Sequence, residues 1–326
     1  MLCVIAGHMG ITKVNSFVFT FHMPLFFLIS GYFFKNSIST VKRNTKKLLI
    51  PYCVTVIAIM LLDDLKNLAK IILGRESISS LLTTTGKWIA AGLYGSGMRT
   101  DFLNMEIPYV GAIWFLLALA WGGAFLYCIL NLKILKSNWL KMLACIVIFA
   151  AGVISALWTW LPISIQAGMT ATLFLYIGYW LRQHKDGERK RIFIPICVII
   201  WAVAFCVSYL NGNMSMASNK FPNPIINIVG AICGSYLIIC LSRRLERTNL
   251  ICKFLTFLGE NSLLVLCVHL VEQKILPWSI IYGIIPNTYV AYIVVYGCKI
   301  IWATGMVILI RKFDGFRRSH LLENTK

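Results

Sequence analysis

The chain has 326 residues, of which 59% are hydrophobic and 13% charged, and its formal net charge at pH 7 is +19. This apolar excess is larger than the core of a soluble protein can bury, so it excludes an ordinary soluble enzyme and indicates an integral membrane protein. The apolar runs are each near the roughly 20 residues that a helix needs to cross the hydrocarbon core, and they lack the alternation of a β-barrel. We therefore predict an all-α, polytopic membrane helical bundle.

The predicted membrane spans take up almost the whole chain. About ten apolar segments follow one another at residues 1–12, 17–34, 46–62, 109–130, 142–160, 163–181, 192–210, 224–241, 255–281 and 288–310. The first segment is too short to cross a bilayer, so we expect a truncated first helix. An insert of moderate polarity at residues 63–108 is the expected outer lid over a substrate. No separate soluble domain is expected, and residues 1–326 are predicted to form a single transmembrane domain.

Lysine and arginine are distributed unevenly between the two sides of the predicted bundle. Of the 31 such residues, 22 lie in segments 35–47, 133–141, 182–191, 243–253 and 311–326. Because cytoplasmic loops are enriched in lysine and arginine, we expect these segments and the C-terminus to be cytoplasmic in a multi-pass protein of the plasma membrane. The charge is split among short loops, which favours anionic lipid headgroups of the bilayer and predicts no nucleic-acid partner.

Among the titratable side chains of the predicted spans, where each is costly to bury and is a candidate for function, five stand out. They are His8, His22, His269, Glu272 and Lys299. His8 and His22 flank a short outer loop, residues 13–16, so they are expected at similar depth on neighbouring helices, facing one cavity. The alternative for His8 is a buried histidine that only hydrogen-bonds a neighbouring helix. For His22, beside a helix kink at Pro24, the alternative is packing.

His269 and Glu272 are three residues apart and therefore share one face of a helix. Such a pair forms either a base with its orienting carboxylate or a structural pair that neutralises buried charge, and the sequence favours the second. Lys299 is expected to pair with Glu272 across the last two spans. Snorkelling to the interface and substrate binding are its alternatives.

A cluster of four cations lies before the apolar run that begins at Pro51 in the third span. It consists of Lys42, Arg43, Lys46 and Lys47. Ordinary positive-inside charge is one explanation. The other is a clamp for the phosphate groups of an acyl-CoA that arrives from the cytoplasm.

Two further features predict structure rather than chemistry. Ser30-Gly31 is typical of a small-residue packing face between membrane helices. The 11 cysteines lie almost wholly in predicted spans, and no pair has CxxC spacing. We interpret them as small, buried apolar residues, and no metal is expected.

Five sequence blocks occur in order along the chain. They are "VIAGH", "FHMPLFFLISGYFF", "KRNTKKLLIPY", "IWFLLALAW" and "LGENSLLVLCVHL". In this order they resemble the blocks of the membrane acyltransferase 3 family, and the second is most similar to its fucose 4-O-acetylase-like branch. The resemblance implies a roughly ten-helix enzyme that moves an acyl group, usually acetyl, from cytoplasmic acyl-CoA (acetyl-CoA) to a hydroxyl of a cell-surface glycan or related acceptor.

The resemblance also implies roles for individual residues. The essential histidine of the family corresponds to His8, and its donor-binding basic residues correspond to Arg43 and Lys46, with Lys42 and Lys47 adjacent. The family usually carries an arginine or lysine eleven residues before this histidine, a position that would precede residue 1.

A mechanism follows from these assignments as a hypothesis. His8 accepts the proton of the acceptor hydroxyl as the hydroxyl attacks the thioester, or relays the acyl group itself. His22 or His269 donates to the oxyanion.

Two other functions fit part of the pattern. A transporter or flippase that exports a glycan or small solute would also use many helices, intramembrane histidines and a kinked helix. Inverted repeats or a chain of coupling carboxylates would favour it, but Glu272 is the one acidic residue deep in a predicted span. A non-catalytic membrane module that senses or anchors is the second alternative, and it has no need of the basic cluster.

Overall fold

The computed structural model describes residues 1–102, 105–184, 193–245 and 249–323. Most of the basic segment 182–191, and parts of 243–253 and 311–326, lie outside the described residues or side chains. The helices are α1 (Leu2–Gly7), α2 (Thr12–Val18), α3 (His22–Tyr32), α4 (Ile38–Ile72), α5 (Ile78–Tyr94), α6 (Trp114–Asn131), α7 (Asn138–Ser155), α8 (Ile165–Gln183), α9 (Phe193–Asn211), α10 (Pro224–Leu245), α11 (Asn249–Glu260), α12 (Ser262–Ile275), α13 (Ser279–Ile284) and α14 (Thr288–Glu323). A short 3₁₀-helix, η1, covers Pro162–Ser164. The predicted all-α class is confirmed.

The number of membrane-crossing helices differs from the prediction. Within the described ranges, seven helices are long and apolar enough to cross a membrane, or up to eight if α11 and α12, which are bent by 79°, form one span. The predicted number of about ten is not confirmed. Two predicted spans do not qualify. The segment before His8 forms only the six-residue α1, and α8 is less apolar than the seven qualifying segments because it carries polar residues such as Gln166 and Thr170.

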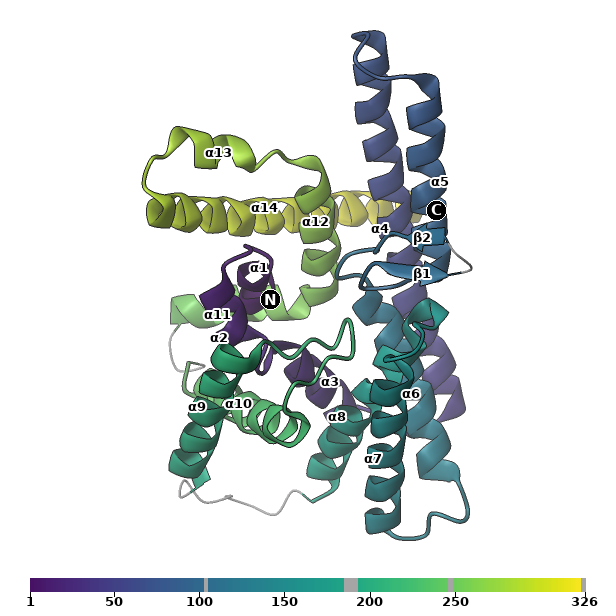
Figure 1. Cartoon of the computed structure of the whole chain (residues 1–326), viewed down its shortest axis with the longest axis vertical. Coiled ribbons are helices and arrows are strands. Elements are labelled where there is room, and N and C mark those ends of the chain that lie inside the picture. The colour runs from purple at the N-terminus through teal and green to yellow at the C-terminus, as the bar shows by residue number, and fades with distance from the viewer. Residues whose placement is uncertain (103–104, 185–192, 246–248, 324–326) are drawn as a thin grey trace.

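The insert at residues 63–108 is more regular than the sequence analysis expected. Helix α4 continues to Ile72, and α5 begins after Ser77, whose side chain accepts a hydrogen bond from the Ser80 backbone N–H. Helix α5 ends at Gly95 with φ of 63°, the left-handed conformation that favours glycine. Strands β1 (Thr100–Phe102) and β2 (Met105–Ile107) then pair antiparallel. The α4–α5 hairpin extends beyond the rest of the molecule in Figure 1.

Helix α8 lies at the centre of the apolar core and packs on α3, α6 and α7. The contact with α3 is close enough to require glycine. A Cβ atom on Gly31 would lie 1.9 Å from the carbonyl oxygen of Leu175, and one on Gly178 would lie 2.0 Å from that of Leu28. The predicted packing face is therefore confirmed at Gly31, because no side chain fits between the two backbones.

The predicted kink at Pro24 is present as an interruption between the two helices α2 and α3. Helix α2 ends at Val18 and α3 begins at His22, which places Pro24 in the first turn of α3. The missing N–H of proline costs nothing there, because the first turn of a helix has no acceptors for its donors. The break leaves the Val18 carbonyl near the His22 ring, with Nδ1 2.9 Å from that oxygen.

The prediction for the cysteines is correct for some and wrong for others. Cys145 and Cys233 are buried, whereas Cys128 and Cys206 are exposed on the outside of their helices. A thiol is apolar enough to face lipid, so the low polarity of the span did not settle which side of the helix each cysteine occupies.

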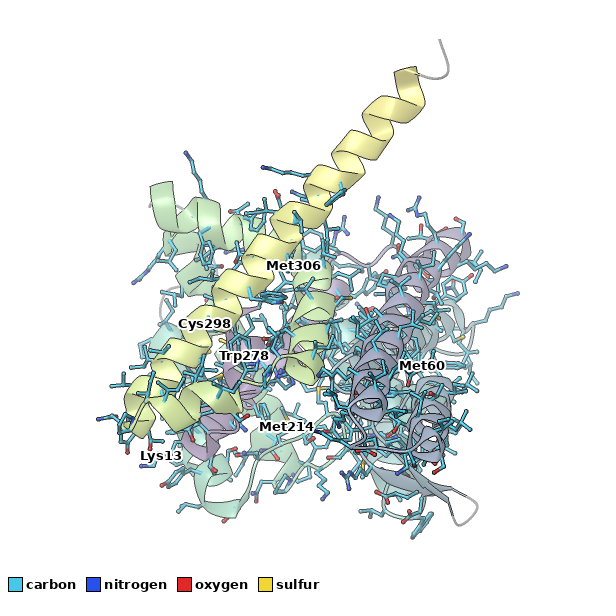
Figure 2. All side chains as sticks on the ribbon, turned by 90° about the horizontal axis from the view of Figure 1, so that it is seen from above. Lys13, Met60, Met214, Trp278, Cys298 and Met306 are labelled. Carbon is cyan, nitrogen blue, oxygen red and sulfur yellow. The ribbon has the colours of Figure 1, made fainter. Side chains whose placement is uncertain are left out.

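The C-terminal helices α12 and α14 lie close to the N-terminal helix α1. Helix α14 crosses α4 in Figure 1 instead of running alongside it, and in Figure 2 its C-terminal part projects beyond the other helices. Helix α12 packs against both α4 and α14, and α1 packs against α14. This arrangement places residues from α1, α12 and α14 next to one another.

Candidate active site

Four polar side chains from α1, α12 and α14 form a chain of close contacts. His8 follows α1, and its Nδ1 lies 3.3 Å from Nε2 of His269 on α12. Nδ1 of His269 lies 2.9 Å from Oε1 of Glu272, one turn further along the same helix. The same carboxylate oxygen accepts a hydrogen bond of 2.8 Å from Nζ of Lys299 on α14. The predicted pairing of Glu272 with both neighbours is confirmed.

Three of these four side chains are buried and one is exposed. His269 is 0% exposed, Glu272 1% and Lys299 4%, whereas His8 is exposed to the space beside it. A buried charge without a partner is strongly unfavourable, and here the Lys299 ammonium and the Glu272 carboxylate compensate each other's charge. Lys299 Nζ also lies 4.8 Å from the ring centre of Trp278, a cation-π contact.

The ion pair determines where the protons of the two histidines reside. A carboxylate only accepts hydrogen bonds, so Nδ1 of His269 carries a proton toward Glu272, although their contact is less well aligned than a full hydrogen bond. In the neutral ring, Nε2 of His269 is then an acceptor, and it receives the Nδ1 proton of His8. Nε2 of His8 is left with a free lone pair.

Two cavities meet at His8. The first, of about 240 Å³, extends along α3 to Ser30 and Leu48. The second, of about 540 Å³, is bounded by Gly97, Tyr109 and Tyr282. Both are lined by His8, Ala112, Trp114 and Ala217. His8 therefore lies where the contents of the two cavities can meet.

His22 lines the first cavity together with His8, as the sequence analysis expected. Its ring stacks on Phe19 with a centroid distance of 5.1 Å. The Val18 carbonyl accepts from Nδ1, so in the neutral ring Nε2 of His22 is an acceptor as well.

The four predicted donor-binding cations, Lys42, Arg43, Lys46 and Lys47, lie in the first turns of α4 and are exposed. They are followed directly by Leu48, which lines the first cavity. The basic cluster thus directly precedes a cavity-lining residue in α4, but none of its four side chains lines the cavity or contacts the described histidines.

Sequence reasoning missed the aromatic and basic residues of the second cavity. They are Tyr109, Trp114, Lys274, Trp278 and Tyr282. Aromatic residues near the ends of apolar segments are also typical of membrane interfaces, so their positions gave no distinct signal. In the described part of the chain, no group of three or more histidine, cysteine, aspartate or glutamate residues is placed to hold a metal ion.

His8 lines two cavities and contacts a second histidine, His269, which is itself oriented by the buried carboxylate of Glu272. This arrangement defines a membrane protein equipped for group transfer. The acyltransferase 3 family model, described as an acyltransferase domain, matches residues 1–312. The chain belongs to this family and is a membrane acyltransferase. No curated protein and no solved structure matches it. The family match does not support the transporter alternative, and membership of the fucose 4-O-acetylase-like branch stays a prediction.

Proposed function

We propose that the protein transfers an acyl group, in the first instance acetyl, from cytoplasmic acyl-CoA to a hydroxyl of a cell-surface glycan or related acceptor. The position of His8 carries this proposal. His8 is exposed to both cavities, while its partner His269 and the Glu272 carboxylate behind His269 are buried. One cavity takes the acyl end of the donor and the other takes the acceptor.

The reaction needs one proton acceptor and one proton donor, and His8 serves as both. Its Nε2 removes the proton of the acceptor hydroxyl while the hydroxyl oxygen attacks the thioester carbonyl carbon. The tetrahedral intermediate collapses with cleavage of the C–S bond, and the leaving thiolate takes the proton from the His8 imidazolium. The products are the ester and free CoA, and His8 returns to its starting state.

The other two histidines have different roles in this scheme. Both ring nitrogens of His269 are engaged, one with Glu272 and one with His8, so we assign it to positioning His8 and not to binding the oxyanion. His22 in its neutral form presents an acceptor nitrogen to the first cavity, so it suits binding a donor group of the substrate better than stabilising an oxyanion.

In this proposal the acyl-CoA donor binds on the side of the membrane where the basic segments lie. Residues 35–47 are on the cytoplasmic side, so CoA phosphates would meet Lys42, Arg43, Lys46 and Lys47 and its thioester would enter the first cavity past Leu48. The C-terminus is then cytoplasmic, and the membrane is the plasma membrane. We treat residues 1–326 as one transmembrane domain, supported by the family match over residues 1–312.

The direct experiment compares two histidine variants of the full chain. Membranes with wild-type protein, His8→Ala or His184→Ala are given radiolabelled acetyl-CoA, and label in the glycan fraction is counted. His184 is the control, because it is a histidine at a helix end whose Nδ1 lies 3.0 Å from the carbonyl oxygen of Trp180 and which lies outside both cavities. His8→Ala is expected to abolish transfer at normal membrane expression, and His184→Ala to leave it unchanged. Wild-type labelling by His8→Ala would refute the proposal.

A further inference from the structure

The second cavity contains a positive charge that the mechanism above does not use. Lys274, in the last turn of α12, lines this cavity together with His8. Its Nζ lies 4.5 Å from the ring centre of Tyr109 and 5.5 Å from that of Trp88. It forms no ion pair with a described side chain, in contrast to Lys299, whose charge is balanced by Glu272.

The charged groups around Lys274 do not balance it. Lys66 adds a second ammonium, whose Nζ donates to the backbone carbonyl of Lys274 at 2.9 Å. Asp63 accepts from Trp88 Nε1, and Asp64 accepts from Thr85, both at 2.9 Å. The two carboxylates thus bond to neutral donors on α5, and the ammonium of Lys274 stays available to an anion inside the cavity.

The remaining wall of this cavity is suited to a sugar ring. Tyr109, Trp114, Trp278 and Tyr282 supply aromatic surface, and Gln273 supplies an amide. Aromatic faces carry negative charge that attracts the slightly positive C–H groups of a pyranose, while a few polar groups fix its orientation. The volume of about 540 Å³ lies within the range of about 300–1,000 Å³ typical of small-molecule sites.

We infer that the second cavity binds an acidic sugar, whose carboxylate or phosphate group pairs with Lys274 while one of its hydroxyls faces His8. That this sugar is the acyl acceptor rests on the proposed function. That the cavity binds it does not. Lys274 is a specificity-determining residue in this scheme. It holds the sugar and takes no part in the proton transfer.

Binding can be measured without catalysis. The full-length protein in nanodiscs of zwitterionic phosphatidylcholine is titrated with methyl β-glucuronide, glucose 6-phosphate or methyl β-glucoside, and tryptophan fluorescence is followed. At least one of the acidic sugars is expected to bind about tenfold more tightly than the neutral glucoside, because a charge-assisted contact is added. The carboxylate and phosphate arms show which anion fits.

Three variants test the assignment to Lys274. Lys274→Gln is expected to remove the preference for the acidic sugar, and Lys274→Arg to retain most of it, which excludes a mere loss of folding. Lys13→Gln is the matched control, since Lys13 lines a separate cavity with Phe205 and Tyr209. It should leave the preference unchanged.

Three outcomes would overturn the inference: equal binding of neutral and acidic sugars, no binding of either acid, or an intact preference in Lys274→Gln. The proposed function fails by a different result, namely acyl transfer by His8→Ala. That variant retains Lys274 and should still prefer the acidic sugar, so the two failures can be told apart.

Discussion

The α3–α8 interface and the junction of α1, α12 and α14 are both buried, but they are built in opposite ways. The first brings two backbones together at Gly31 and Gly178, where no Cβ atom fits. The second buries a carboxylate and an ammonium beside two histidines. Close apolar packing supports stability without offering chemistry. A charged cluster in a low-dielectric site is a poor source of stability but fixes proton positions. Damage to the two regions should therefore separate stability from activity.

The largest effect is expected from Lys299→Met, which leaves Glu272 as an unpaired buried charge. Loss of one partner of a buried ion pair costs about 3–5 kcal/mol, so the free energy of unfolding should fall by that amount. The measurement is thermal or denaturant unfolding in detergent.

The double variant Glu272→Leu/Lys299→Met separates the contribution of the ion pair to stability from its contribution to catalysis. Without a lone charge it should regain most of the stability. Its kcat should remain about 10- to 100-fold below wild type, a part of the 10²–10⁴ that a positioned base contributes. A double variant with wild-type kcat would show that the ion pair is only structural.

The next largest effect is expected from Gly31→Ala at the α3–α8 interface. The added methyl group collides with the Leu175 backbone, and overpacking of this kind costs about 1–3 kcal/mol. Gly86→Ala on α5 is the matched control, since no atom lies within 4 Å of the position that its added Cβ would take, and it should stabilise by about 0.5–1 kcal/mol. Both are read from unfolding midpoints. Equal effects of the two substitutions would contradict the close packing.

A smaller effect, confined to substrate binding, is expected at the basic start of α4. Replacement of Lys42, Arg43, Lys46 and Lys47 by glutamine should raise KM for acetyl-CoA about tenfold or more, because exposed ion pairs contribute about 0.2–1 kcal/mol each. The kcat and the unfolding midpoint should not change.

Neutralising the lysines at 133, 136 and 141 serves as control for that prediction and should leave KM unaltered. An unchanged KM in the α4 variant would show that the four cations do not bind the donor and only set the orientation of the protein in the membrane. Absence of any acyl-CoA binding by the wild-type protein would favour the non-catalytic module instead.

The smallest effect is expected from Tyr52→Phe, which tests the α4–α5 hairpin. The Tyr52 hydroxyl donates to the Gly92 carbonyl at 2.7 Å, and such a bond contributes about 1 kcal/mol. The unfolding midpoint should fall slightly while kcat and KM stay constant. A large loss of activity would show that this hairpin also supports the site.

Much of the fold could be predicted from the sequence because apolar run length determines where helices form. The count of spans could not, since α1 is too short, α8 is too polar and the bend between α11 and α12 divides one apolar run. Helix α5 had recognisable signals in Ser77 and Gly95, a capping residue and a left-handed glycine.

The site was predictable only where its residues are close in sequence. The three-residue spacing of His269 and Glu272 predicts a shared helix face. The contact of His8 with His269 joins residues 261 positions apart, and no local pattern specifies it. The same holds for the second cavity, where Lys274 meets Trp88 and Tyr109 from other segments.

The proton positions on His8 test the account most directly. The chain has five histidines, so ¹⁵N NMR of histidine-labelled protein in bilayers can be assigned by comparison with His8→Ala. We predict a proton on Nδ1 of His8 and none on Nε2, and a mixture of the two tautomers in Glu272→Leu/Lys299→Met. A wild-type His8 with its proton on Nε2 would contradict it, because the nitrogen assigned as the base would have no lone pair to offer.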